Sequence, residues 1–182
     1  LDLLRNVAAQ VGFADVELIS EPAAAARHYA ASGRLQEGDT VAVYDFGGGT
    51  FDAAVVQVRD GIIQVVNHAG DNFLGGKNID WDIVEKLLIP RLAAEHPLAG
   101  FARNSTKWRS AVAKLKWHAE LAKIKVSRTR APAAITIDNL CIDDRGRQVD
   151  FVFDLRPSDV ESITEPWITQ SIHLCKTALS DK

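Results

Sequence analysis

Hydrophobic positions recur with helical spacing over much of the chain, and glycine or proline marks the ends of most periodic stretches. The clearest stretch places Trp108, Leu115 and Val126 on one face, which we expect to be buried. Within another stretch, Pro90 is expected to kink the helix or to end its first part. The predicted helices are residues 2–12, 21–31 with Ser20 as the N-cap, about 78–95, 106–127 and a last helix that begins at Pro157. The inward side expected for the last helix consists of Val160, Ile163, Trp167, Ile168, Ile172, Cys175 and Leu179.

Runs of β-branched and aromatic residues, separated by short turn sequences, predict two β-systems. In the first, a Gly-Gly-Gly-Thr turn and an Asp-Gly turn join three strands in meander order. In the second, a turn over residues 143–147 joins two strands. The predicted strands are 40–46, 51–59 and 62–69 in the first system, 134–142 and 148–155 in the second, and a short separate strand at 16–19. Two hairpin systems separated by long helices predict an α/β lobe with a smaller α+β insertion.

Composition narrows the class of protein. The chain has 182 residues, 47% hydrophobic and 25% charged, which is typical of a folded globular protein. Its 21 basic and 24 acidic residues give a net charge of -3 without an extended basic run, so nucleic acid is not an expected partner. No apolar run approaches the length that spans a bilayer, so no membrane association is expected. Two distant cysteines, Cys141 and Cys175, favour a reducing, cytoplasmic location.

Residues 44–52, Tyr-Asp-Phe-Gly-Gly-Gly-Thr-Phe-Asp, combine a glycine-rich turn with an acid on each of the two strands. Because glycine lets the backbone approach a ligand closely, successive N–H groups of Gly47, Gly48 and Gly49 can surround an anion. The neighbouring oxygens suit a hydrated magnesium ion beside phosphates, and they belong to Asp45, Thr50 and Asp52. The plainer alternative is a glycine-rich hairpin tip. The spacing is neither that of a P-loop nor that of a dinucleotide-binding fingerprint.

Two weaker signals lie further along the chain. Gly75 and Gly76 precede a predicted helix, whose N-terminus favours negative ligands. Glu120, Lys123 and Ser127 share a stripe of the 106–127 helix, which could present an acid and an amine to ribose hydroxyls and a hydroxyl to a purine edge. By spacing alone, ordinary loop geometry and a solvated surface ion pair explain these features better. No histidine or cysteine spacing fits a metal site, and no nucleophile elbow occurs.

Four motifs, in this order and spacing, resemble the ATPase domain of the DnaK-type seventy-kilodalton heat-shock chaperones. They are LISEPAAAARHYA at 18–30, VYDFGGGTFD at 43–52, GDNFLGGKNID at 70–80 and AELAKIKVS at 119–127. The resemblance runs nearly end to end. It implies an actin-like, ribonuclease H-like fold and identifies the chain with the second lobe of a two-lobed nucleotide-binding domain.

The resemblance also implies roles for individual residues. Asp45 resembles the acid that holds the magnesium hydration shell, Asp52 a cation-site acid, and Glu21 the glutamate that helps to place the hydrated metal. Gly47–Gly49 and Thr50 resemble the second phosphate loop. The residues implied near the ribose, the adenine and the phosphates are Gly75, Gly76, Glu120, Lys123 and Ser127.

Some positions depart from the family pattern. Ala23 stands where the family has threonine, Lys77 and Asn78 stand where acids often follow the glycine pair, and Ile124 stands where some members place an arginine against adenine. The first phosphate loop, the lobe-one lysine and the late adenosine loop of the family have no counterpart in the sequence.

The implied organisation divides the chain into three parts of lobe two. Residues 1–75 form the first part of the core subdomain, 76–156 a smaller adenosine-side subdomain, and 157–182 a returning helix of the core. The chain begins at a leucine inside a helical pattern and contains no methionine, so we expect it to be a piece of a longer polypeptide. Lobe one and a peptide-binding domain would lie in the rest of that polypeptide.

The expected function is that of an ATP-driven protein-folding chaperone, with ATP or ADP and magnesium as cofactors. Unfolded client peptides, a co-chaperone and a nucleotide-exchange factor are the expected partners of the parent protein, besides lobe one. Phosphoryl transfer to water needs both walls of the phosphate site, so this chain alone is expected to show no turnover. The alternatives are an actin-fold kinase acting on a small molecule and a non-enzymatic, chaperone-like scaffold whose site has drifted.

Overall fold

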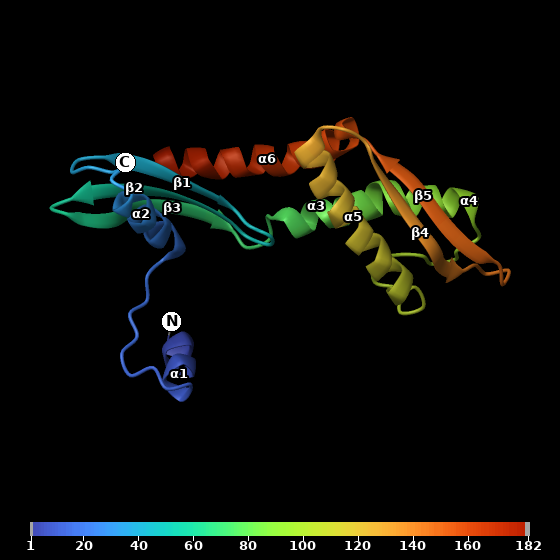
Figure 1. Cartoon of the computed structure of the whole chain (residues 1–182), viewed down its shortest axis with the longest axis horizontal. Coiled ribbons are helices and arrows are strands. Elements are labelled where there is room, and N and C mark those ends of the chain that lie inside the picture. Colours follow the sequence, from blue (N-terminus) through green and yellow to red (C-terminus); the bar gives the residue numbers. More distant parts are fainter. Residues whose placement is uncertain (1, 181–182) are drawn as a thin grey trace. The chain divides into compact units, whose positions relative to one another are not determined.

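The computed structural model describes residues 2–180, which form a mixed α/β structure with two small sheets (Figure 1). The chain divides into two compact units. Unit 1 contains the residues up to Asp45, Asp52–Gly70 and the residues from Leu174. Unit 2 contains Phe46–Phe51 and Asp71–His173. None of the helices within the described residues combines the length and the apolar character needed to cross a bilayer.

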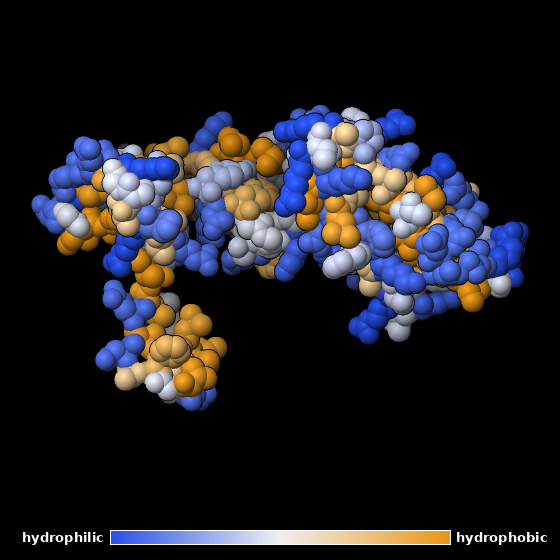
Figure 2. Space-filling model, viewed as in Figure 1, coloured by the Kyte–Doolittle hydropathy of each residue, from blue (hydrophilic) through white to orange (hydrophobic). Residues whose placement is uncertain are grey.

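Unit 1 is built on a three-stranded sheet of order β1-β2-β3, and the short connections require antiparallel neighbours. Its helix α2 packs on this sheet, because Ala26 of the helix shares a small buried cluster with Ala54 and Val56 of β2. The helix α1 buries no residue and has a largely apolar surface (Figure 2). The elements are α1 (Asp2–Gln10), α2 (Glu21–Ala31), β1 (Thr40–Phe46), β2 (Phe51–Arg59) and β3 (Ile62–Asp71).

Unit 2 holds the larger hydrophobic core, in which helices and a two-stranded antiparallel sheet pack together. Leu88, Leu115 and Leu155 come from three different elements of this core and have no exposed surface. The elements are α3 (Gly76–Ile83), a π-helical segment η1 (Val84–Leu88), α4 (Ile89–Glu95), α5 (Arg109–Thr129), β4 (Ala133–Ile142), β5 (Gln148–Leu155) and α6 (Pro157–Ser180), whose last residues belong to unit 1.

Most of the predicted elements are present with small shifts of their ends. The predicted buried face of α5 is confirmed, since Trp108, Leu115 and Val126 are all buried. The helix predicted near 78–95 begins two residues earlier, at Gly76, and is continued through the π-helical turn η1. Pro90 then falls in the first turn of α4, directly after the π-helical turn, so the first α-helical part ends before the proline as one of the two expected outcomes.

Two predictions about the elements are wrong. Residues 16–19 form no strand, because this extended segment has no strand to pair with among the described residues. The inward face predicted for the last helix holds only in part: Ile163 is buried, whereas Ile168, Ile172 and Leu179 are exposed. A periodic apolar stripe marks a face that is able to pack, and the packing itself depends on which elements are beside it.

Candidate functional site

The loop Gly47–Thr50 leaves a run of backbone donors without partners. The N–H of Gly47 donates to the carbonyl of Thr50 at 2.9 Å and closes the turn. Among residues 2–180, the next three amides, those of Gly48, Gly49 and Thr50, donate no hydrogen bond. Buried backbone N–H groups are almost always paired, whereas Gly48 and Thr50 are exposed, so the donors of this turn are accessible to a ligand. Such a run of donors is suited to an anion.

Aromatic side chains anchor both ends of this loop in unit 2. Phe46 packs against the core of unit 2, and Phe51 has no exposed surface. Their ring centroids lie 5.9 Å apart. The chain is therefore fixed immediately before and after the glycines, which are themselves the most flexible residues of the loop.

A second glycine-rich segment holds the loop through its carbonyl groups. The N–H of Gly76 donates to the carbonyl of Gly47 at 3.0 Å, and the N–H of Lys77 donates to the carbonyl of Gly48 at 2.7 Å. Both donors belong to the first turn of α3, whose amides have no partners within the helix. The start of α3 thus satisfies the acceptors of the loop and leaves its donors free.

Gly75 must be a glycine for reasons of space. A Cβ at this position would lie 2.5 Å from the nitrogen of Gly49 and 2.8 Å from the carbonyl carbon of Gly48. Real Cβ atoms do not approach backbone atoms so closely. The backbone of Gly75 is extended, with φ -175°, which any residue can adopt. The requirement for glycine therefore comes from the close approach of two backbone segments.

A buried carboxylate connects α3 to α5. Asp80 is 1% exposed, and its Oδ1 lies 2.5 Å from Nζ of Lys123 while its Oδ2 lies 3.5 Å from Nζ of Lys116. Within the described part of the chain, Oδ1 has a cation beside it but no donor in hydrogen-bond geometry. Lys123 also donates to the carbonyl of Gly76 at 3.1 Å. The ammonium of Lys123 therefore lies between the buried acid and the segment that holds the loop.

Glu120 completes this charged cluster from the α5 side. Lys116 donates to Glu120 at 2.7 Å, and this hydrogen bond is the largest cause of a lowered pKa at Glu120. Burial is the next largest cause and raises the pKa of Glu120, whereas the charges of Lys116, Lys123 and Lys77 lower it further. Partial burial alone would lower the pKa of Lys116, but its contacts with Glu120 and Asp80 raise it overall. The lowered pKa of Glu120 and the raised pKa of Lys116 both favour the charged forms of these side chains.

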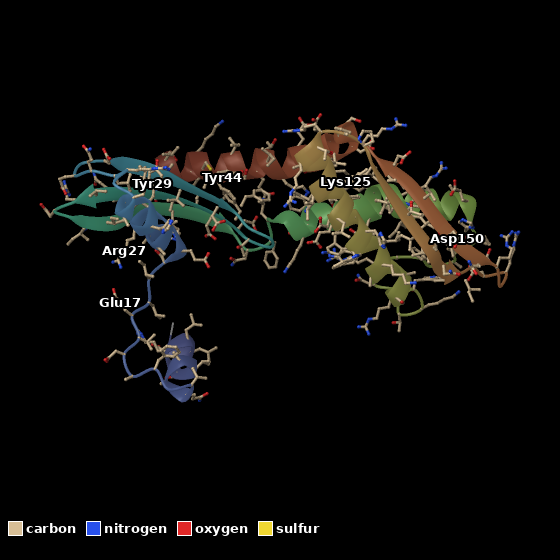
Figure 3. All side chains as sticks on the ribbon, in the orientation of Figure 1. Glu17, Arg27, Tyr29, Tyr44, Lys125 and Asp150 are labelled. Atoms are coloured by element: carbon tan, nitrogen blue, oxygen red, sulfur yellow. The ribbon has the colours of Figure 1, made fainter. Side chains whose placement is uncertain are left out.

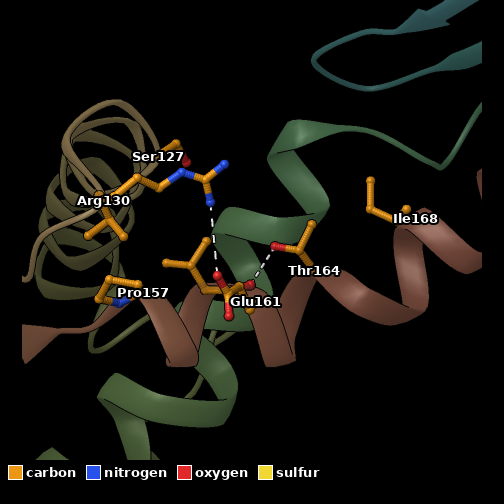
Figure 4. Close-up of a pocket in the computed structure, with 8 residues that line it drawn as sticks. Ser127, Arg130, Pro157, Glu161, Thr164 and Ile168 are labelled. Carbon is orange, nitrogen blue, oxygen red and sulfur yellow. Dashed lines mark hydrogen bonds and ion pairs between the residues drawn. The ribbon is translucent and has the colours of Figure 1, made fainter.

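Ser127 lies one turn beyond this cluster and lines a separate pocket of about 360 Å³ (Figure 4). Val126 and Val160 form part of its apolar lining. Arg130 and Glu161 face each other beside Ser127, with a nitrogen-to-oxygen distance of 3.9 Å. This pocket therefore combines a hydroxyl, an ion pair and apolar surface within unit 2.

The acids predicted near a metal ion are described within unit 1. Glu21 and half-buried Asp52 line one pocket of about 460 Å³, together with His68. Asp45 is exposed at the end of β1 and precedes the glycine loop by two residues. Among residues 2–180 there is no cluster of three histidine, cysteine or acidic side chains placed to hold a metal ion directly.

The structure brings many of the predicted residues together. The two glycine segments are in direct contact, Lys123 reaches Gly76, and Glu120 joins them through Lys116 and Asp80. Asp80 and Lys116 were not among the predicted site residues. Lys116 lies four residues before Glu120 and extends the polar stripe of α5 by one turn, which spacing alone could have indicated. Asp80 lies between Ile79 and Trp81, and an acid at such a position needs a cationic partner when it is buried.

Comparison with known proteins places the chain in a family. Residues 5–182 match the family model described as Hsp70 protein. The chain is 34% identical over 170 residues to the protein named chaperone protein DnaK from Mycoplasma mobile. The aligned region covers 93% of this chain and 27% of that relative, so the chain spans about a quarter of the relative's length. A match over nearly the whole chain, together with this relative, means that the chain belongs to the Hsp70 protein family.

Proposed function

We propose that this chain supplies one wall of a nucleotide-binding site and that the loop Gly47–Thr50 binds the phosphate tail of ATP or ADP. The observation that carries the proposal is the run of three free amides, at Gly48, Gly49 and Thr50, on a loop whose Gly47 and Gly48 carbonyls are already hydrogen-bonded. Free amides next to lysine side chains are suited to phosphate oxygens, because they stabilise negative charge with donors that are already in place.

The residues around the loop fit an adenine nucleotide with magnesium. Gly75 contributes no side chain where its backbone approaches Gly49, and Lys123 supplies a nearby positive charge. Asp45 and Asp52 would hold the metal ion through its water shell, as hard oxygen ligands. Bound magnesium would neutralise part of the phosphate charge. Glu120 and Ser127 are proposed to contact the nucleoside.

We further propose that the chain is lobe two of an actin-like ATPase domain. Residues 1–75 and 157–182 would form its core subdomain, and residues 76–156 its smaller one. In the whole protein, closure of two lobes over ATP would drive binding and release of unfolded peptides, with a co-chaperone and an exchange factor as partners. A relative named as a chaperone supports this assignment. Free thiols at Cys141 and Cys175 support a cytoplasmic location.

Calorimetry of the full-length protein with MgATP tests the proposal. We expect a dissociation constant in the micromolar range or below, together with ATP turnover and ATP-dependent release of a bound unfolded peptide. Asp45→Ala should abolish or strongly weaken nucleotide binding, whereas Asp15→Ala, which removes another exposed acid of unit 1, should leave it unchanged. An intact protein that binds no nucleotide would contradict the proposal and favour a scaffold. Phosphate transfer to a small acceptor would favour a kinase.

A further inference from the structure

Lys77 lies against the glycine loop with its backbone and with its side chain. Its N–H donates to the carbonyl of Gly48 at 2.7 Å. Its Cε lies 4.0 Å from the point that a Cβ on Gly48 would occupy. The aliphatic part of the Lys77 side chain therefore lies beside the loop at Gly48, and the ammonium nitrogen is bonded to this Cε.

The ammonium of Lys77 is free, whereas the other two ammonium groups of the cluster are held. Lys116 is paired with Glu120 and Asp80, and Lys123 with Asp80 and the carbonyl of Gly76. Among residues 2–180, Lys77 has no ion-pair or side-chain hydrogen-bond partner, and it is exposed. Its charge nevertheless acts on Glu120, which places it within the same electrostatic environment.

A count of charges shows what Lys77 adds to the cluster. Lys116 and Lys123 balance Asp80 and Glu120, so these four side chains together carry no net charge. Lys77 is therefore the lysine of this cluster whose charge is not balanced by an ion pair within it. An anion at these amides has one mobile cation available to it that does not have to leave another partner.

We propose that Lys77 binds the phosphate tail of the nucleotide and makes the affinity of the site depend on the number of phosphate groups. The inference rests on the proposed nucleotide site and adds a residue and a specificity to it. A lysine ammonium acts as a mobile point charge on a flexible stem, so it can follow the end of a phosphate chain. Its contribution should therefore increase from adenosine to ADP to ATP.

Titration calorimetry of the full-length protein tests this proposal with adenosine, MgADP and MgATP as probes. Lys77→Met keeps the length and apolar character of the stem and removes the charge. We expect it to weaken MgATP binding about tenfold, MgADP binding less, and adenosine binding not at all. Lys77→Glu should weaken MgATP binding more than Lys77→Met. Raising the salt concentration should reduce the difference between wild type and Lys77→Met.

Lys125→Met is the matched control, because Lys125 is another exposed lysine of unit 2, on α5 (Figure 3). It should leave the affinity for all three probes unchanged. Equal affinities of wild type and Lys77→Met for MgATP would overturn the role of Lys77 while leaving the nucleotide site intact. Equal losses for adenosine and MgATP would also overturn it, because they indicate a general distortion. A wild-type protein that binds neither MgADP nor MgATP would overturn both proposals.

Discussion

Two turns of unit 2 connect neighbouring strands, and they satisfy their backbone groups in opposite ways. In the turn between β4 and β5, the carboxylate of Asp143 accepts the N–H groups of Arg145 at 2.8 Å and Arg147 at 2.9 Å, and it also pairs with the guanidinium of Arg147. In the turn between β1 and β2, no carboxylate of residues 2–180 accepts from the amides of the loop Gly47–Thr50. The amides of the first turn are satisfied by a side chain of the turn itself, whereas three amides of the second have no partner in the described part of the chain.

The difference separates a structural turn from a loop that is proposed to bind a ligand. Both turns contain glycine and have acidic residues nearby, so composition does not separate them. What separates them is the source of the negative charge that meets the amides. Asp143 provides it from within the chain, and its side chain is fully buried in doing so. The Gly47–Thr50 loop has its carbonyls fixed by α3 and its amides open to a ligand.

Gly75→Ala should have the largest effect on the glycine loop, because it forces the start of α3 away from the loop. The added Cβ would meet backbone atoms of Gly48 and Gly49 that cannot rotate away. We expect the free energy of unfolding to fall by about 3 kcal/mol and nucleotide binding to be lost. Urea denaturation and calorimetry of the full-length protein measure the two effects.

Gly49→Ala provides the control for that substitution. A Cβ on Gly49 has no atom within 4 Å, so the free energy of unfolding should change by no more than about 0.5 kcal/mol. If both alanine variants are equally stable, the two glycine segments do not form the close contact described here.

Asp80→Ala should have the next largest effect, since it removes the acid that both lysines of the cluster share. Lys116 keeps Glu120 as a partner, but Lys123 loses its only carboxylate among the described residues. We expect a loss of about 2 kcal/mol in the free energy of unfolding, below the usual range for a broken buried pair because both lysines retain some exposure. Asp80→Asn, which preserves shape, separates the charge effect from the effect of a cavity. An unchanged denaturation midpoint in both variants would contradict this view of the cluster.

The turn between β4 and β5 should respond to acid, whereas the glycine loop should not. Hydrogen bonds from the backbone of Arg147 and then of Arg145, with the Arg147 guanidinium, lower the pKa of Asp143 from its usual 3.8. A lowered pKa in the folded state gives stability that is present above the unfolded pKa and is lost as pH falls through the folded pKa. Wild type should therefore lose stability below about pH 4 more steeply than Asp143→Asn.

Denaturation midpoints measured from neutral to acidic pH test this expectation. Asp154→Asn is the control, because Asp154 is an exposed acid on the adjacent strand β5. Its profile should follow that of wild type. Parallel profiles for wild type and Asp143→Asn would mean that Asp143 does not stabilise the turn through its charge.

The sequence predicted the strands that flank both turns but only part of the contacts made around the glycine loop. The strands around the Gly47–Thr50 loop were predicted to the residue, because β-branched runs and glycines mark their ends. The sequence indicated open amides in this loop, although it did not show that the N–H of Gly47 closes the turn. The contact with Gly75 was beyond prediction, since it depends on segments that meet only in the folded chain. Asp80 was missed for the same reason: its burial follows from packing between α3 and α5, and no local pattern specifies it.

Glu120→Gln should have the smallest effect on the free energy of unfolding, and it tests the proposed nucleoside contact. Glu120 is 42% exposed, so its ion pair with Lys116 contributes no more than about 0.5 kcal/mol. The nucleotide site, unlike the completed turn at Asp143, should nevertheless depend on this side chain, because the ribose is proposed to donate to its carboxylate. We therefore expect Glu120→Gln to weaken the binding of MgATP several-fold and to leave that of the 2′,3′-dideoxy analogue unchanged. Equal losses for both nucleotides would place Glu120 away from the ribose and limit its role to holding Lys116.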